Sequence, residues 1–333
     1  MTAYVVRRVF YMAITLALVS VVGFAIIQLP PGDFLDSHLR QLGITGAQLT
    51  EEELQDIRAY YGLDKPGYMQ YFVWVSNLLR GDLGDSYSFQ IPVAELVGAR
   101  LPLTVVVSVL TIVVTFLIAI PIGIYTATHQ YSFGDYTATV FGFIGLATPN
   151  FMLALLLMWM SLSWLNFPIT GLFSSEYLDQ PWSVAKFIDM LKRLPVAILV
   201  VATSGTAGLI RVMRGSMLDE LQKQYVITAR SKGLEEGTLL FKYPVRIAMN
   251  PIISGIGGVF PEIVSGTIIT AIVLNLPTVG PLLFNALTQE DMQLAASIVM
   301  VLSVLTVVGV FVSDMLLLWL DPRIRFGAES NTA

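Results

Sequence analysis

Apolar residues along the 333-residue chain gather in six long runs, and polar residues gather between them. Each run holds about 20 or more mostly apolar positions, the length that an α-helix needs to cross the hydrocarbon core of a bilayer. Helices are the expected form of these runs, because backbone polar groups at that depth must be satisfied without water. The predicted spans are residues 9–29, 101–126, 137–165, 194–213, 248–274 and 292–320.

The composition supports a membrane protein and excludes several other classes. Hydrophobic residues make up 55% of the chain and charged residues only 13%, with a mean hydropathy of +0.72, whereas a soluble domain is about one quarter charged. The chain has no Cys, and its only histidines are His38 and His129. These counts exclude a Cys-based zinc site and an HExxH metal helix, so we expect no metal site. The net charge of −5 argues against a nucleic-acid partner, because such proteins are usually basic.

The placement of basic residues predicts that both termini are cytoplasmic. Arg7 and Arg8 precede the first span, and Arg323 and Arg325 follow the last, in agreement with the excess of Lys and Arg on cytoplasmic flanks. In this orientation the external segments carry 15 of the 24 acidic residues and 8 of the 19 basic residues. The external face is therefore acidic, and the cytoplasmic face is basic.

Two loops are longer than simple connections require. The external loop contains a short helix predicted near Leu49–Leu54, and an amphipathic stretch, Tyr68 to Leu79, that suits a membrane interface. The predicted layout is a cytoplasmic N-terminus with span one (1–29), an external loop or subdomain (30–100), spans two to four (101–213), a cytoplasmic loop (214–247), spans five and six (248–320) and a cytoplasmic tail (321–333).

The cytoplasmic loop reads as two short helices. Ser216 is a candidate N-cap of the first, and Gly233 is a natural residue just beyond its end. A second stretch, Thr238 to Arg246, follows. Helices outside the bilayer suggest a docking element for a cytoplasmic partner, although a solvated basic loop would also satisfy the positive-inside rule.

The run Gln224 to Leu234 resembles the "EAA" coupling loop of ABC importer permeases, in the form found in the dipeptide/oligopeptide permease family. Further motifs occur in the family's order along nearly the whole chain, and they resemble the first of the two permeases of such systems. They are Arg7-Arg8, Leu29–Asp33, Gly62–Pro66, Gln70-Tyr71, Gly81–Gly84, Leu276–Gly280 and Leu320–Arg325. The chain departs from the general loop motif, since Ile227-Thr228-Ala229 stands where Glu-Ala-Ala begins it.

The resemblance implies an all-α importer subunit in the bacterial cytoplasmic (inner) membrane. Its implied partners are a second, homologous permease, two cytoplasmic ATPases that bind ATP and Mg, and an external substrate-binding protein. This chain would carry no cofactor and would not itself be an enzyme, since it has no GxxxxGK[ST] motif for ATP phosphates. Carried over by position, the residues that couple to the ATPases are Tyr225, Thr228, Ala229, Arg230, Lys232 and Gly233.

Four residues are candidates for the translocation pathway or gate. Glu262 follows Pro261 in the fifth span, and an acidic residue within a span is costly and often functional. An acid paired inside the bundle is the alternative for Glu262. Asn275, Pro277 and Gly280 belong to the motif segment that follows this span.

The resemblance implies di- or oligopeptides as the cargo class, with oligosaccharides or nickel as alternatives within the same importer class. An ion-coupled secondary transporter is a less favoured alternative, because such proteins often show internal repeats and none is obvious here. An intramembrane enzyme is disfavoured, because the chain has no GxSxG, Cys or HExxH constellation.

Overall fold

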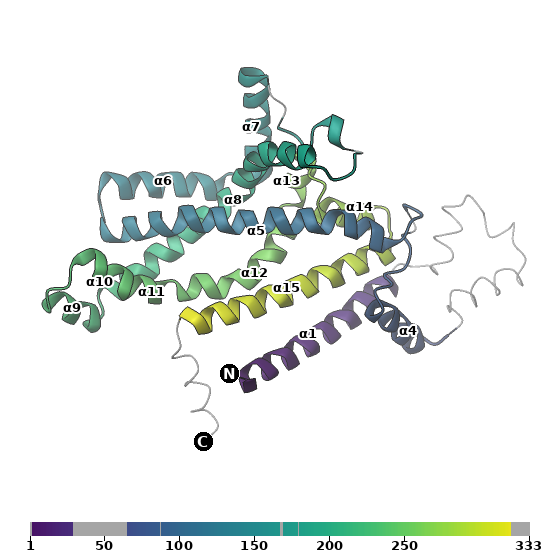
Figure 1. The fold of residues 1–333 in the computed structure, drawn as a ribbon, viewed down its shortest axis with the longest axis horizontal. Helices are drawn as coiled ribbons and strands as arrows, with labels where there is room; N and C mark the ends of the chain where they lie inside the picture. The colour runs from purple at the N-terminus through teal and green to yellow at the C-terminus, as the bar shows by residue number, and fades with distance from the viewer. Residues whose placement is uncertain (1, 29–64, 87, 167–168, 179, 321–333) are drawn as a thin grey trace, which may run out of the picture. The chain divides into compact units, whose positions relative to one another are not determined.

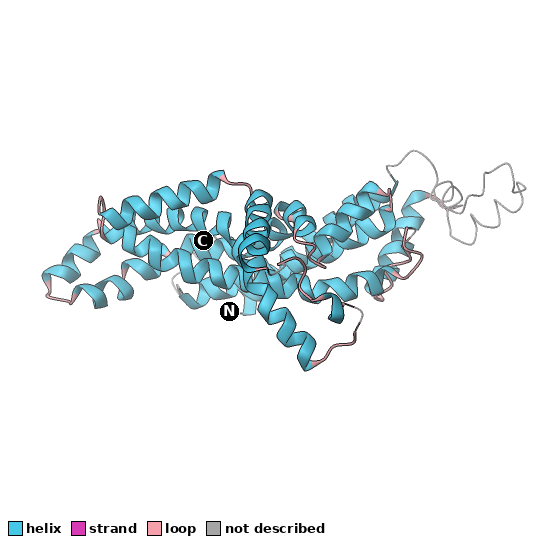
Figure 2. Ribbon diagram, turned by 90° about the horizontal axis from the view of Figure 1, so that it is seen from above, coloured by secondary structure: helices cyan, strands magenta, loops and turns pink. Residues whose placement is uncertain are grey.

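The computed structural model describes residues 2–28, 65–86, 88–166, 169–178 and 180–320 (Figure 1). Within these ranges the chain is helical, with one isolated bridge between Asp85 and Pro92 and no strand (Figure 2). The chain divides into two compact units. Of the described residues, unit 1 contains Leu103–Pro281 and Thr306–Leu320, and unit 2 contains those within Thr2–Pro102 and Leu282–Leu305.

In unit 2, the N-terminal helix α1 (Thr2–Gln28) packs against α4 (Gly67–Leu79). Ser20 Oγ and Tyr71 OH lie 2.8 Å apart, and the ring of Phe24 meets that of Tyr71 edge-on at 5.5 Å between centroids. The amphipathic stretch predicted from Tyr68 to Leu79 is therefore confirmed as a helix. The helix predicted near residues 49–54 lies outside the described residues.

The start of α15 (Met292–Leu320) holds the Gly81–Gly84 segment in place. Asp291 is 1% exposed and accepts from the backbone N–H of Leu294, which caps the helix. Its other oxygen accepts from Ser86 Oγ at 2.5 Å, and Gln293 Nε2 donates to the carbonyl of Leu83 at 2.9 Å. This motif segment therefore has a structural role in unit 2.

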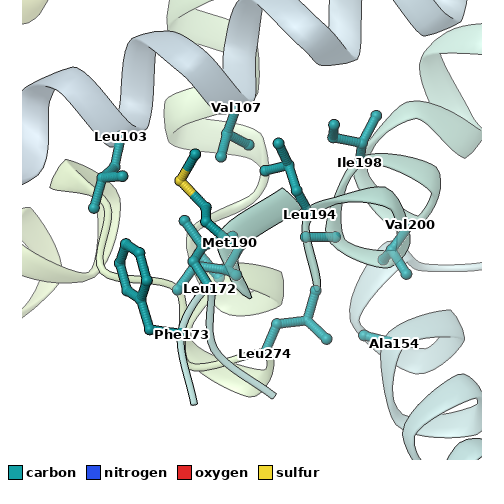
Figure 3. Packing of buried hydrophobic residues seen from close by; sticks show 13 residues of the cluster. Leu103, Val107, Ala154, Leu172, Phe173, Met190, Leu194, Ile198, Val200 and Leu274 are labelled. Carbon is teal, nitrogen blue, oxygen red and sulfur yellow. The ribbon is translucent and has the colours of Figure 1, made fainter. Parts of the chain in front are cut away.

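Unit 1 is built on two long helices, α5 (Val93–Thr128, which begins in unit 2) and α8 (Val184–Leu221). Its other elements are α6 (Phe133–Ala147), α7 (Asn150–Leu165), the 3₁₀ turn η2 (Ser175–Tyr177), α9 (Gln224–Ser231), α10 (Glu236–Lys242), α11 (Pro244–Ala248), α12 (Asn250–Gly266), α13 (Ile268–Val273), the first turn of α14 (Val279–Thr288) and the part of α15 from Thr306 to Leu320. A buried apolar cluster joins α5, α7, α8 and α13 (Figure 3), and includes Leu103, Val107, Leu194 and Leu274.

Among the described residues, four helices are long and apolar enough to cross a membrane: Val5–Ile26, Val93–Thr128, Val184–Leu221 and Met292–Leu320. At about 1.5 Å per residue, the 36 residues of α5 extend well beyond the roughly 30 Å of a bilayer core. The last predicted span, 292–320, coincides with α15.

The two remaining predicted spans are interrupted. The run 137–165 is two helices, α6 and α7, bent by 101° at a break that contains Pro149. A residue before proline is pushed out of the helical region, and Thr148 is extended, with ψ of 119°. The run 248–274 is broken at Thr267 into α12, of 17 residues, and α13, of six. The described helices thus supply four membrane-capable spans, or five if the bent pair counts as one.

Candidate functional site

The predicted coupling segment consists of three short helices after α8, grouped together in Figure 1: α9, α10 and α11. The expectation that a helix begins at Ser216 is wrong, because α8 continues through this residue to Leu221. Met213 and Met217 explain the continuation: both are fully buried, one turn apart on the face that packs into the core. The helix ends where Lys223 turns to an extended conformation, with ψ of 145°.

An ion pair fixes the last turns of α8. Arg214 donates twice to Asp135 at the start of α6, from Nε at 3.1 Å and from a terminal nitrogen at 3.0 Å. The Asp135 side chain is only 5% exposed, and it also accepts from the backbone N–H of Tyr131. We call Asp135, Met213, Arg214 and Met217 the root of the segment. Bidentate pairing of this kind restricts the relative orientation of its two partners.

Beyond the root, residues 224–242 form a small unit with its own core, which we call the tip. Val226 and Leu239 are fully buried, Ala229 is 7% exposed, and these three pack together between α9 and α10. Tyr225, Leu234 and Tyr243 cover this cluster. Isolated helices of eight and seven residues would be unstable in water, so their mutual packing holds the tip together.

Gly233 ends α9, as its sequence position predicted. Its φ of +77° lies in the left-handed region that favours glycine. Its N–H donates to the carbonyl of Arg230, and the N–H of Leu234 donates to that of Ala229. This pair of bonds is a Schellman motif, and Leu234 completes it with an apolar contact to the core of the tip.

Two polar contacts link the tip to itself and to the end of α8. Arg230 donates twice to Glu236 across the turn from α9 to α10, at 2.6 and 3.1 Å. These hydrogen bonds lower the pKa of Glu236 and raise that of Arg230. Tyr225 OH donates to Glu220 at 2.5 Å. Burial, followed by this hydrogen bond and the negative charge of Glu220, raises the pKa of Tyr225.

The structure separates the six predicted coupling residues into two groups. Thr228, Arg230, Lys232 and Gly233 are exposed, whereas Ala229 packs inside the tip and Tyr225 is half-buried. Sequence reasoning missed Ile227 and Phe241, large apolar side chains that are 46% and 68% exposed. The sequence carries no signal for them, because only the packing of α9 against α10 buries Val226 and leaves the neighbouring Ile227 on a different, outward face of the helix.

The predicted pathway residues occupy different kinds of position in the structure. Asn275 ends α13 in the left-handed region, with φ of +51°, and its N–H bonds to Ile272 while that of Leu276 bonds to Ala271. It thus has the same capping geometry as Gly233. Glu262 lies within α12, but its side chain is outside the described part. Pro277 is half-buried.

Gly280, the fourth candidate, lines a small cavity within unit 1. The other lining residues are Thr104, Val107, Ser108, Val201, Thr267, Ala271, Leu276 and Thr278. Thr104 Oγ1 accepts from the backbone N–H of Val279 at 2.9 Å, which ties α5 to the start of α14. The cavity lies where the helical run 248–288 is broken, at Thr267 and again at residues 275–278.

Hydrogen bonds hold residues 170–174, just before α8, against the end of α13, next to the break at residues 275–278. Gly171 donates from its backbone N–H to the carbonyl of Leu274 at 2.6 Å. Arg193 on α8 donates to Thr170 O and Ser174 Oγ, and Asp189 accepts from Ser174 at 2.6 Å. The connection between α7 and α8 is therefore fixed against the end of α13.

This fold and this segment define a multi-span helical membrane protein that carries an exposed helical unit at the end of a long span. The chain belongs to the family described as binding-protein-dependent transport system inner membrane component, whose profile matches residues 119–326. The N-terminal family of the same transport-system membrane components matches residues 1–110.

Relatives match over nearly the full chain. The oligopeptide transport system permease protein AppB of Bacillus subtilis (strain 168) is 32% identical over 98% of this chain and 100% of its own length. The inner membrane ABC transporter permease protein YejB of Escherichia coli O157:H7 is 28% identical over 98% of this chain and 99% of its own. OppB, an oligopeptide transport system permease protein of Haemophilus influenzae, is 28% identical over 98% and 100%.

Proposed function

We propose that this chain is one of two permease subunits of an ATP-driven importer for short peptides in the bacterial cytoplasmic membrane. The names of relatives that match over 98% of the chain, two of them oligopeptide permeases, support the cargo class. The proposed complex contains a second, homologous permease, two ATPases that bind ATP and Mg, and an external substrate-binding protein. The proposed layout keeps six spans with both termini inside, the bent pair α6–α7 and the broken run α12–α13 each counting as one.

The tip is the observation that carries this proposal. It is a self-supporting pair of helices at the end of α8 that displays Ile227 and Phe241 to its surroundings. Exposed apolar side chains on a small ordered element are typical of a protein contact. In the proposed complex the tip fits a groove on an ATPase, and its movement passes through the root into α8.

The contact is tested by the retention of ATPase subunits during purification. The Ile227→Asp and Phe241→Asp variants should lose most of the co-purifying ATPase, because each places a carboxylate in an apolar contact. Tyr131→Asn is the matched control: Tyr131 is 77% exposed in the turn between α5 and α6, and its φ of +61° is one that Asn adopts readily. Equal ATPase retention in all three variants would refute docking through the tip.

Transport itself is tested with the assembled importer in proteoliposomes. A mixture of synthetic tri- to pentapeptides should accumulate inside only when both ATP and the binding protein are present, as detected by mass spectrometry. Uptake of nickel or oligosaccharides in place of peptides would overturn the cargo assignment. Uptake by this chain alone, driven by an ion gradient, would overturn the importer class.

A further inference from the structure

A stripe of hydroxyl side chains runs along the buried face of α5. Thr104, Ser108, Thr111 and Thr115 follow one another at spacings of four, three and four residues, so they share one face of the helix. None of them is more than 8% exposed. Ser108 is the sixteenth of the 36 residues of α5, which places it about 22 Å along the helix at 1.5 Å per residue and inside the predicted span 101–126.

Two hydroxyls of this stripe, those of Ser108 and Thr111, differ from most others in the described helices. Hydroxyls in helices commonly donate to the carbonyl of the preceding turn, as Thr203 does to Leu199 and Ser303 does to Val299, both at 2.7 Å. By contrast, Ser108 Oγ and Thr111 Oγ1 are buried and have no hydrogen-bond partner within the described chain. A buried hydroxyl without a partner costs about 1–3 kcal/mol, so a partner from outside the chain is expected.

The cavity beside Ser108 can supply that partner. Thr104, Thr267 and Thr278 line it together with Ser108, and none of its lining residues is charged. It has room for roughly one water molecule. The breaks at Thr267 and at residues 275–278 border it, and irregular backbone at membrane depth is tolerated where it is buried in protein or lines a water-filled cavity.

We propose that this cavity is a point of contact on the substrate route. In the conformation described here Ser108 binds a water molecule, and when α5 and α13 separate during transport its hydroxyl hydrogen-bonds to the uncharged amide groups of a passing peptide. A hydroxyl both donates and accepts, so it suits the N–H and the C=O of any peptide bond regardless of side chains. The identity of the cargo in this inference rests on the proposed function.

Accessibility to a water-soluble thiol reagent tests the cavity. The chain has no Cys, so Ser108→Cys introduces a single thiol, and Ala119→Cys provides a control on the same helix at a fully buried position outside the cavity. In the assembled importer, the cationic methanethiosulfonate reagent MTSET should modify Cys at 108 at least about 10-fold faster than at 119, because thiol reactivity follows access. Equal rates at the two positions would overturn the proposal.

Protection by substrate tests the contact. With ATP and the binding protein present, the tri- to pentapeptide mixture should slow the modification at position 108, because the peptide and the reagent compete for the same space. Modification that is equally fast with and without peptides would overturn the contact with substrate. This readout does not depend on uptake, so it can fail while the wild-type importer still transports peptides.

Removal of the hydroxyl gives the second readout. Ser108→Ala should raise the transport KM for peptides by about 2- to 10-fold, the value of one neutral hydrogen bond, without lowering the thermal stability. Ser108→Thr should restore the wild-type KM because it keeps the hydroxyl, and Ser303→Ala should not change KM, since Ser303 bonds its own helix. An unchanged KM for Ser108→Ala, or a KM raised equally by Ser303→Ala, would overturn the proposal even where peptide uptake by the wild type confirms the importer.

Discussion

The root and the tip of the predicted coupling segment contain the same kind of ion pair in different surroundings. In the root, Arg214 and Asp135 pair with side-chain exposures of 32% and 5%. In the tip, Arg230 and Glu236 pair with exposures of 49% and 55%. The buried pair joins α8 to α6, whereas the exposed pair joins two short neighbouring helices. Two ion pairs of similar geometry are therefore expected to contribute unequally to the free energy of unfolding.

The difference indicates how a movement can pass through the segment. The tip has its own small core, so it can move as one body. The root resists bending, because Met213 and Met217 are buried in the core and Arg214 is held by two hydrogen bonds. A displacement applied at the tip should therefore reach α8 as a rigid shift rather than as local unfolding.

Loss of the buried pair should have the largest effect. Asp135→Asn removes the charge that Arg214 needs, and should lower the free energy of unfolding by about 2–3 kcal/mol; the partial exposure of Arg214 keeps this below the roughly 3–5 kcal/mol of fully buried pairs. The measurement is the thermal stability of the detergent-solubilised protein. The double variant Asp135→Asn/Arg214→Met should recover part of the loss, because no unpaired charge remains. A loss no greater than that of Glu236→Gln would remove the distinction between root and tip.

Replacing Gly233 at the end of α9 with a residue that strains the backbone should have an intermediate effect on stability. Gly233→Val forces a β-branched residue to φ of +77° and should cost about 1–2 kcal/mol. Gly233→Asn is the matched control, since Asn also occurs at this capping position and should cost less. Proteolysis of the tip would show the difference, with faster cleavage in the Val variant only. Equal cleavage of the two variants would contradict the capping role.

The exposed pair, Arg230 and Glu236, should contribute little to the free energy of unfolding, and only over a defined pH range. Glu236→Gln should destabilise by at most about 0.5 kcal/mol at neutral pH, since solvent screens a pair that is half exposed. The pKa of Glu236 is lowered in the folded state, so its contribution is present above the usual value of about 4.3 and is lost as pH falls through the folded pKa. The stability difference between wild type and variant, measured by thermal unfolding, should therefore vanish in acid. A difference that persists below that range would point to another cause.

The hydrogen bond from Tyr225 to Glu220 should lose its contribution to stability at high pH rather than at low pH. Its pKa is raised, so the bond to Glu220 contributes below about pH 10 and is lost as pH rises through the folded value. Tyr225→Phe should therefore be less stable than wild type at neutral pH by about 1 kcal/mol and approach it in strong base. Thermal unfolding across alkaline pH checks this sign, and a difference that grows with pH would refute it.

On the outer surface of the tip, the expected stability effect is no larger than that of the exposed ion pair. Thr228→Ala and Lys232→Ala should each stay within about 0.5 kcal/mol of wild type, as exposed substitutions usually do. The Thr228 hydroxyl bonds only to the carbonyl of Gln224 in its own helix. In the proposed complex these variants should instead reduce transport-coupled ATP hydrolysis. A large fall in stability would show that these side chains support the tip rather than contact a partner.

Features that depend on local chemistry were predicted correctly. The span 292–320 matches α15, the stretch from Tyr68 to Leu79 matches α4, and Gly233 ends its helix as expected. Long apolar runs and a left-handed glycine each carry their own signal, because few other structures accommodate them.

Features that depend on distant contacts were not predicted. Ser216 looked like a cap, yet the burial of Met213 and Met217 carries α8 past it. The break at Thr267 that divides the predicted fifth span into α12 and α13 was also not predicted. The run 137–165 was predicted as one span, and the 101° bend at Pro149 was not predicted.

The sequence alone determined that this chain is a helical membrane protein and which family motifs it carries, because apolar length, charge placement and motif order are properties of the linear chain. Only the tertiary structure decided which hydroxyls on α5 lack partners, which ion pair is buried, and which side chains of the tip face outward. Those properties depend on what lies across a helix interface, and the spacing of residues along one helix shows its faces but not their neighbours.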